Sequence, residues 1–374
     1  MNERIVISGC GLVSALGNNC EENWQNLVAG KSAIQPVDKN FFGAFRNSPD
    51  SEKILFDMLS TAIEQALAEA KLSSPAAKNL SSGLILGLGK PDLFSLQHSP
   101  TDFSLTEFWN QKLLEQIRTQ LSNKCLISLT PVSACSTGLT ALYLARHWLL
   151  DNLVDIVICA AGESPRHPLI SESYRQLGLL TTDAVRPFSS GRTGFALGEG
   201  AGAIVLEKES TSKKRQAKIS GYLEKIALSQ ARHNPINYGG DWQPLADLIK
   251  SVTTIADKKI IPDYIKAHGT ATVLNDILES QAIIQAFGEA AQTINISSLK
   301  PAIGHTLSAS GLIELIIAIM AKNNNVIPPT LNWLGRDKNC PLNYTPNNPE
   351  KRKINYLLAI SLGFGGQIAA ALVN

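Results

Sequence analysis

The chain has little net charge, few cysteines and no apolar run long enough for a bilayer. Its 34 basic and 32 acidic side chains leave a formal net charge of +2, and the basic ones are scattered. This balance gives no general reason to expect nucleic acid or an anionic membrane surface as a partner. The most apolar late segment, residues 311–321, is too short to span a membrane and contains Glu314. It is therefore predicted to be a core helix.

Two features of exported proteins are missing as well. The N-terminus has no basic leader with a long apolar stretch, because Gly9 and Gly11 interrupt its apolar run, so a cytoplasmic location is expected. None of the six cysteines forms a CxxC pair or has a histidine at zinc-site spacing. The sequence thus indicates neither a disulfide framework nor a structural metal, and leaves the cysteines as candidates for catalysis.

A dinucleotide-binding turn is suggested near the N-terminus and then excluded. A strand at residues 4–9 leads through two glycines to a helix that begins after Asn18 or Asn19 and ends at Gly30. Ser14 stands where a third glycine is needed, and no acidic residue ends a strand at the usual distance.

The chain is rich in apolar residues, which make up 44% of its 374 residues, whereas charged residues make up 18%. This apolar content is enough for a large core. Continuous apolar runs at residues 154–163 and 200–209 are typical of strands buried on both faces, so helices should cover both sides of a sheet. Amphipathic spacing predicts a helix over residues 51–72. The polar, basic stretch at residues 209–221 is the expected boundary between an N-terminal half, 1–210, and a C-terminal half, 217–374.

Cys135 directly precedes a predicted helix that has no clearly polar face. Unpaired backbone N–H groups and the positive dipole end of this helix would stabilise a thiolate and lower the pKa of Cys135. That arrangement favours a nucleophile with an oxyanion donor beside it, and the alternative is an inert buried cysteine. Two histidines of the second half, His268 and His305, lie beside glycine turns, where each alone would also suit a hydrogen-bonded loop histidine.

Taken together, these segments resemble the beta-ketoacyl synthases, the condensing enzymes of fatty acid and polyketide synthesis. The matching stretches occur in the family's order over almost the whole chain: VSACSTG, RPFSSGRTGFALGEGAGAIVLE, AHGTATVLND, LKPAIGHTLSASG and SLGFGG. The resemblance implies the thiolase-like α/β fold, with two related halves in a layered α-β-α-β-α architecture. It also implies a homodimer, or a heterodimer with a sister subunit.

The resemblance assigns roles residue by residue. It implies that Cys135 accepts the acyl group, that His268 and His305 face it, and that Lys300 belongs with them, with Glu314 as acidic support for Lys300. Because Glu314 lies in an otherwise apolar helix, this role explains its charge better than an exposed helix face would.

Further matches concern the route of the substrate. The backbone N–H groups of Cys135 and Phe364 would form the oxyanion hole, and Phe364, Gly365 and Gly366 would form a gate. Thr270 and Thr272 match positions that contact the phosphopantetheine arm of acyl carrier protein.

The implied reaction is a decarboxylative Claisen condensation. An acyl thioester held on the cysteine would react with malonyl carrier protein to give a beta-ketoacyl carrier protein, with hydrogen bonds from two imidazoles stabilising the enolate. No metal and no permanently bound cofactor is implied, since the pantetheine arm carries the substrate. An acidic carrier could also meet the basic residues of the 209–221 stretch, which are Lys213, Lys214, Arg215 and Lys218.

Several family positions are altered. Ser189 and Thr193 stand where many relatives have aspartates, which is expected to loosen a loop, and Gln367 and Ile368 replace a common Thr-Asn pair beside the gate. The segment 90–130 is shorter than usual. These departures favour a specialised fatty acid or polyketide pathway.

Three other functions compete with an elongating synthase. A chain-length-factor-like partner subunit usually lacks the cysteine that this chain keeps. A thiolase needs a second catalytic cysteine near the C-terminus, whereas the last one here, Cys340, lies outside any motif. A starter-unit synthase of the Cys-His-Asn kind would not need the second histidine.

Overall fold

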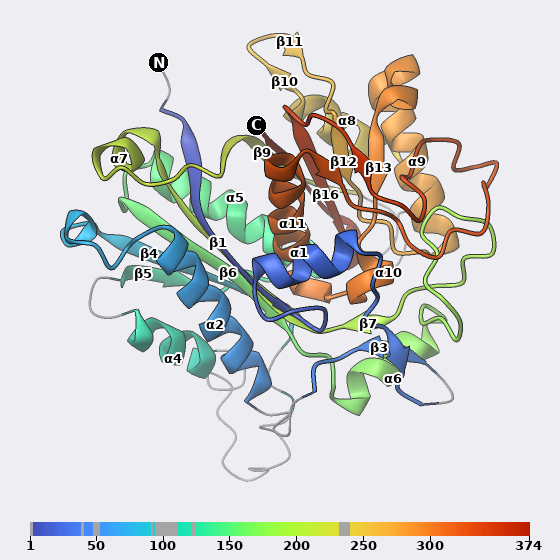
Figure 1. The fold of residues 1–374 in the computed structure, drawn as a ribbon, viewed down its shortest axis with the longest axis horizontal. Coiled ribbons are helices and arrows are strands. Elements are labelled where there is room, and N and C mark those ends of the chain that lie inside the picture. Colours follow the sequence, from blue (N-terminus) through green and yellow to red (C-terminus); the bar gives the residue numbers. More distant parts are fainter. Residues whose placement is uncertain are drawn as a thin grey trace.

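One mixed sheet of ten strands forms the centre of the protein (Figure 1). The structure, a computed structural model, describes residues 3–38, 41–47, 53–90, 93, 111–121, 125–231 and 240–374. The strands of the first half are β1 (Ile5–Ser14), β4 (Ser82–Leu88), β5 (Cys125–Leu129), β6 (Ile156–Glu163) and β8 (Gly200–Lys208). Those of the second half are β9 (Gly221–Gln230), β12 (Tyr264–Lys266), β13 (Asn295–Ser297), β16 (Leu357–Gly363) and β17 (Gln367–Val373).

The two halves of the sheet have the same topology. Counted from the centre outward, the first half runs β1-β8-β6-β4-β5 and the second runs β9-β17-β16-β12-β13. In each half the two central pairings are antiparallel and the two outer ones are parallel. A repeated order with repeated strand directions is what a duplicated unit would produce. The halves join where Val6 pairs with Tyr222 and Ile7 with Gly221.

Helices cover both faces of each half, as the apolar strands predict. The outer helices are α2 (Ile54–Glu69) and α4 (Lys112–Gln120) over the first half, and α8 (Gln243–Val252) and α9 (Val273–Phe287) over the second. Between the halves lie α5 (Thr137–Leu150) and α11 (Ser310–Asn324). The order of layers is therefore helix, sheet, helix, sheet, helix, and the α/β prediction is confirmed. The two sheet layers are continuous through β1 and β9 rather than separate.

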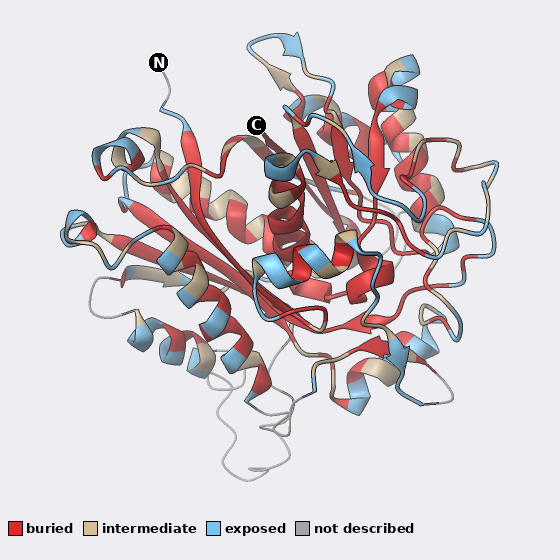
Figure 2. Cartoon of the chain, viewed as in Figure 1, coloured by how far each residue is buried: buried red, intermediate tan, exposed pale blue. Residues whose placement is uncertain are grey.

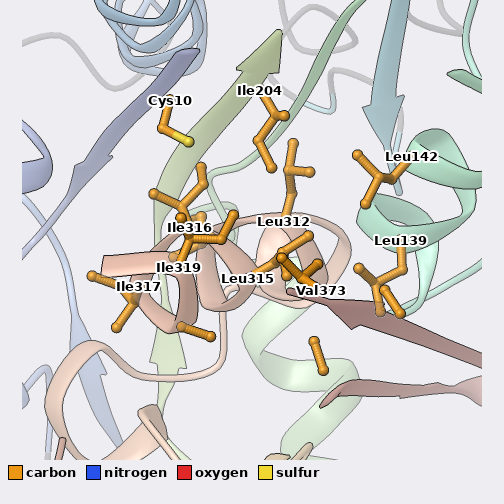
Figure 3. Close-up of a cluster of buried hydrophobic side chains, with 14 of the residues drawn as sticks. Cys10, Leu139, Leu142, Ile204, Leu312, Leu315, Ile316, Ile317, Ile319 and Val373 are labelled. Carbon is orange, nitrogen blue, oxygen red and sulfur yellow. The ribbon is translucent and has the colours of Figure 1, made fainter. Parts of the chain in front are cut away.

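The two central helices approach each other at glycines. A Cβ atom on Gly138 of α5 would lie 2.7 Å from the backbone N of Leu312, and one on Gly311 of α11 would lie 2.9 Å from the Leu139 side chain. Nearly all of α11 is buried (Figure 2). Leu312, Ile316 and their neighbours pack between strands of the sheet and α5 (Figure 3). The core helix predicted around residues 311–321 is confirmed.

Shorter elements complete the chain. They are α1 (Cys20–Val28), β2 (Gln35–Pro36), β3 (Phe42–Ala44), η1 (Pro75–Ala77), α6 (Pro168–Gln176), β7 (Leu197–Gly198), α7 (Glu209–Lys214), β10 (Thr254–Ile255), β11 (Lys258–Lys259), η3 (Gly288–Thr293), α10 (Lys300–Ile303), η4 (Leu307–Ala309), β14 (Val326–Ile327), β15 (Glu350–Lys351) and η5 (Phe364–Gly366). The side chain of Asn19 caps α1 by accepting a hydrogen bond from the backbone N of Glu22 at 2.8 Å, as predicted.

Some boundaries differ from the predictions. The helix expected at residues 51–72 begins later, at Ile54, and residues 51 and 52 lie outside the described part. The stretch 209–221 is not simply a polar loop, because α7 occupies its first half. Most of the segment 90–130 lies outside the described residues. In the part of the chain that the structure describes, every helix is too short or too polar to cross a bilayer.

Candidate active site

Cys135 lies at the entrance to the central helix α5, two residues before its first turn, and its side chain is buried. The preceding Ala134 has a left-handed φ of 45°, which turns the chain sharply into the helix. Strand β16 fixes this turn from the other side, since the hydroxyl of Ser361 donates to the carbonyl oxygen of Cys135 at 2.8 Å. A Cβ atom on Gly363 would lie 3.0 Å from the backbone N of Cys135, so only glycine fits there without a shift.

The predicted lowering of the Cys135 pKa is wrong. Burial raises this pKa to about 11, although Lys90 and Lys300 act in the opposite direction. A thiolate in this site loses its hydration, and the charges of the two lysines do not compensate for that loss. Cys135 is therefore a thiol at neutral pH, and its proton has to leave when the sulfur forms a new bond.

A small aromatic cluster surrounds the sulfur. Cys135 packs with Tyr174, Phe195 and Leu307, and the half-buried ring of Phe364 lies against this group. The ring centroids of Tyr174 and Phe364 are 6.0 Å apart. Because Phe195 also contacts His305, with 5.0 Å between ring centroids, the cluster links the cysteine to the histidines.

Two backbone hydrogen bonds hold His305 against β7. The His305 N–H donates to the carbonyl oxygen of Ala196 at 2.7 Å, and the Gly198 N–H donates to the carbonyl oxygen of His305 at 3.0 Å. Just before the histidine, Gly304 has a φ of +69° and lies directly against Gly198. The FALGEGAG stretch, residues 195–202, therefore packs against the histidine turn and continues into strand β8.

The tautomer of His305 follows from its partners. Its Nδ1 accepts a hydrogen bond from the backbone N–H of Leu307 at 3.3 Å and lies 2.9 Å from the hydroxyl oxygen of Ser310. An amide N–H can only donate, so Nδ1 of the neutral ring has no proton. The proton is then on Nε2, which is free to donate to a substrate oxygen.

His268 follows strand β12, and its backbone is held by charged side chains. Its N–H donates to Glu279 Oε1 at 2.6 Å, and its carbonyl oxygen accepts a hydrogen bond from Lys300 Nζ. The His268 and His305 rings have centroids 5.3 Å apart and planes 82° apart. Nδ1 of His268 is buried and has no hydrogen-bond partner among the described residues.

Both imidazoles are neutral at neutral pH. Burial lowers the pKa of His268 and of His305 well below 6.5, and the positive charge of Lys300 lowers both further. A neutral imidazole donates a single N–H. The pair can thus offer two hydrogen bonds to one developing negative charge without contributing a proton of its own.

Lys300 and Glu314 form a buried ion pair, with 2.8 Å between Nζ and Oε1. Glu314 is almost completely buried, which excludes the alternative that it marks an exposed helix face. Two neighbours of this pair were not predicted from the sequence. Lys266 Nζ lies 2.5 Å from Glu314 Oε2, and Glu279 binds the turn after β12. The sequence signal that could have identified Lys266 was a charged residue in the otherwise apolar strand β12.

Thr270 and Thr272 lie at the start of α9, and their hydroxyl oxygens are 2.9 Å apart. Thr270 is buried and Thr272 is half-buried, so the pair spans the change from interior to surface. Gln367, just past the predicted gate, accepts a hydrogen bond from the Ser133 hydroxyl at 3.2 Å. The altered position beside the predicted gate is thereby hydrogen-bonded to the turn that holds Cys135.

The loosened loop expected at Ser189 and Thr193 is not observed. The Ser189 hydroxyl donates to the Gly335 carbonyl oxygen at 3.0 Å and accepts from the Leu334 N–H at 3.0 Å. The Thr193 hydroxyl lies 2.8 Å from that of Thr181. Short hydroxyl contacts fix this loop in place of the aspartates.

The basic residues after β8 are less available to bind an acidic carrier than the sequence suggests. Arg215 is buried and its Nε donates to Glu207 at 2.8 Å, so it cannot meet a partner. Lys213 is paired with Glu209 at 2.7 Å and Lys218 with Glu69 at 3.1 Å. Elsewhere, the described residues contain no group of three or more histidine, cysteine or acidic side chains placed to hold a metal ion.

Comparisons with known proteins match almost the whole chain. Family models for the N-terminal domain and the C-terminal domain of beta-ketoacyl synthase match residues 2–212 and 241–333. The chain is 30% identical to 3-oxoacyl-(acyl-carrier-protein) synthase 2 of Coxiella burnetii, covering 97% of this chain and 96% of that protein. It is 28% identical to nodulation protein E of Rhizobium meliloti, covering 98% of each.

A solved structure shares the whole fold. It contains a type II polyketide synthase acyl-carrier protein in complex with its ketosynthase bound to the hexaketide. The match has a TM-score of 0.90 at 25% identity and covers 100% of both chains. The ishigamide ketosynthase/chain length factor matches with a TM-score of 0.84 at 23% identity, over 100% of this chain and 99% of that one, and so supports the thiolase-like fold.

Proposed function

The chain belongs to the beta-ketoacyl synthase family, and we propose that it condenses an acyl group held on Cys135 with malonyl carrier protein, releasing carbon dioxide. The product is a beta-ketoacyl thioester on the carrier. The observation that carries this proposal is the pair of neutral imidazoles, His268 and His305. One aromatic cluster joins them to Cys135 at the start of a central helix.

In the first half-reaction the sulfur of Cys135 attacks the carbonyl carbon of an acyl thioester. The bond from that carbon to the carrier sulfur breaks, and the proton of the cysteine thiol is transferred to the departing thiol. The N–H groups of Cys135 and Phe364 stabilise the negative oxygen of the intermediate. The close approach of Gly363 to the backbone N of Cys135 supports this role, because Phe364 directly follows Gly363, the last residue of β16.

In the second half-reaction the malonyl thioester loses carbon dioxide, and the electrons of the broken bond form an enolate. His305 donates its Nε2–H to the enolate oxygen, and His268 donates to the same oxygen. The enolate carbon then attacks the acyl carbon, the bond from that carbon to the Cys135 sulfur breaks, and the sulfur takes up one proton from the solvent. The tautomer that Leu307 imposes on His305 supports this assignment, since the donor nitrogen is fixed before substrate binds.

The carrier's phosphopantetheine arm is proposed to enter past Thr270 and Thr272. Beside them, Val273 and Leu274 are 54% and 59% exposed, and Arg192 joins this helix end to the loop 334–338.

In the loop 334–338 exposed residues alternate with half-buried ones, so Leu334, Arg336 and Lys338 face outward. We name the surface of Val273, Leu274, Leu334, Arg336 and Lys338 the carrier patch. Apolar side chains flanked by cations suit a partner that is acidic around an apolar contact.

The second partner is proposed to be another synthase chain, identical or a sister subunit. Strand β5 is the last strand of its half and pairs on one side only, with β4, among the described residues. Leu126 and the nearby Val132 are 64% and 58% exposed. An exposed apolar edge strand favours pairing with a second chain.

A non-elongating partner subunit is the second candidate. The retention of Cys135 together with both histidines argues against it, because such a subunit makes no covalent bond to substrate. The altered positions Gln367 and Ile368 favour a specialised pathway over housekeeping fatty acid synthesis. Comparable growth when this chain replaces a housekeeping synthase would contradict that part of the proposal.

Intact-protein mass spectrometry tests the enzyme assignment. The purified protein is incubated with an acyl carrier protein thioester, and an added acyl mass is expected on the wild type. Cys135→Ala should remove the adduct, whereas Cys20→Ala, a change at a half-buried cysteine outside the cluster, should retain it. Absence of an adduct on the wild type, with carrier shown to be acylated, would favour the partner subunit.

A further inference from the structure

Glu314 is shared by two buried lysines that come from different elements. Lys300 of α10 contacts its Oε1 at 2.8 Å, and Lys266, the last residue of β12, contacts its Oε2 at 2.5 Å. Both lysines are completely buried. A buried ammonium group is costly unless it is paired and hydrogen-bonded, so a second one under the active site requires an explanation.

Three buried charged side chains, Lys266, Lys300 and Glu279, hold one short piece of backbone. Lys266 Nζ donates to the carbonyl oxygen of Ala267, and Lys300 Nζ donates to that of His268. On the other side, Glu279 accepts from the N–H groups of His268 and Gly269 at 2.6 and 2.9 Å. Every one of these bonds ends on the backbone within one residue of His268.

The formal charges of this set cancel. Lys266 and Lys300 balance Glu314 and Glu279, all of them buried. Without Lys266, the set would keep two carboxylates against one ammonium group, in a region with no access to water. Lys300 would then be drawn more strongly toward Glu314, and its hydrogen bond to the His268 carbonyl oxygen would weaken.

We propose that Lys266 is a positioning residue for decarboxylation. It fixes the turn that carries His268 and shares Glu314, so that Lys300 stays bonded to the His268 backbone. This inference rests on the proposed function, and it concerns only the half-reaction in which His268 stabilises the enolate. Acyl transfer to Cys135 uses the N–H groups of another turn and does not depend on Lys266.

The ionisation of Lys266 should make the rate of decarboxylation depend on pH. Burial lowers the pKa of Lys266 to about 8, and Lys300 lowers it as well, while Glu314 and Glu279 raise it. Lys266 therefore loses its proton as the pH rises through about 8. Above that pH Glu314 keeps one charged partner only, and the rate of decarboxylation should fall while acylation of Cys135 does not.

The first experiment uses the unaltered protein. Carbon dioxide release from malonyl carrier protein and acyl-adduct formation on Cys135 are each followed between pH 6 and 9.5, on separate samples. A fall near pH 8 in decarboxylation alone supports the proposal, whereas parallel profiles overturn it. Loss of both activities at every pH would instead contradict the proposed function, so the two failures are distinguishable.

Two variants complete the test. Lys266→Met removes the charge and is expected to lower decarboxylation by about tenfold to a hundredfold while acylation stays within about twofold. Lys266→Arg keeps a charge that does not titrate, and should restore part of the rate without the fall near pH 8. Equal loss of both half-reactions in Lys266→Met, at unchanged thermal stability, would overturn the proposal. If neither variant folds, the pH profiles of the wild type still decide.

Discussion

The imidazole rings of His268 and His305 stand almost perpendicular to each other, 82° apart, with their centroids separated by 5.3 Å. They come from two turns of the second half that are held in different ways. His305 is fixed by backbone pairing with β7 of the first half, and His268 by charged side chains beneath it. The site is thus assembled from both halves of the chain, and each ring can be perturbed separately.

Removing either imidazole should affect one half-reaction. His305→Ala and His268→Ala are each expected to lower decarboxylation about a hundredfold to a thousandfold, the usual loss for one oxyanion donor. Acylation of Cys135 should remain. The measurement is carbon dioxide release beside intact mass, with His147→Ala on α5 as the control that leaves both unchanged. An equal loss of acylation would show that the histidines act in the first half-reaction instead.

The neutral histidines should make the fold sensitive to acid. Their pKa values in the folded protein lie well below 6.5, and the unfolded chain has ordinary values near 6.5. Below about pH 6.5 the unfolded chain therefore binds more protons, and the free energy of unfolding falls by up to about 1.4 kcal/mol per pH unit for each histidine.

Urea unfolding at several pH values checks this slope. Glu279 and Asp276 make the free energy of unfolding change with pH in the opposite direction, because burial raises their pKa values to about 7 and about 6. The comparison is therefore made between the wild type and His268→Asn/His305→Asn, which share those carboxyl groups. The double variant should lose less stability on acidification, and an unchanged slope would contradict the assignment of neutral rings.

Gly198 should not tolerate a side chain. A Cβ atom there would lie 2.2 Å from the carbonyl oxygen of Ile303, next to the turn that carries His305. Gly198→Ala is expected to displace that turn and to lower decarboxylation about a hundredfold. Gly335→Ala is the matched control, since its Cβ would meet only the Ser190 hydroxyl oxygen, at 3.3 Å. Comparable activity of the two variants would be evidence that close packing at Gly198 does not position the turn that carries His305.

Reversing the cations of the carrier patch should weaken binding of the carrier and spare the chemistry. Arg336→Glu/Lys338→Glu is expected to raise KM for malonyl carrier protein about tenfold or more at low salt, with less effect at high salt. Turnover of a small malonyl thioester should be unchanged.

Lys258→Glu/Lys259→Glu supplies a control of equal charge on the β10–β11 hairpin. Lys259 lies over the ring of Phe287 at the far end of α9, about 22 Å of helix from Val273. An equal rise in KM for both double variants would mean that only net charge matters, and that the carrier patch has no special role.

Local patterns were sufficient for much of the fold and for the position of Cys135 just before a central helix. The runs that form β6 and β8 are continuous and apolar, and such runs leave little choice but a strand covered on both faces. The apolar segment after Cys135 likewise required a central helix, and none of its residues is exposed. These features depend on the residues of one segment alone.

Properties that depend on the surroundings could not be predicted in the same way. The pKa of Cys135 is set by burial, and the burial comes from Phe195, Phe364 and other residues far along the chain. Lys266 was overlooked because a single lysine in a short strand usually reaches solvent, and only packing beneath α11 makes it a partner of Glu314. The union of the halves through β1 and β9 also depends on tertiary packing.

The hydrogen bond from Ser361 to the carbonyl of Cys135 connects residues 226 positions apart. A ribosome needs about 10–45 s to add that length of chain. During this interval the emerging cysteine has no β16 behind it. The folded environment of the Cys135 sulfur is therefore complete only after the β16–β17 hairpin has been made.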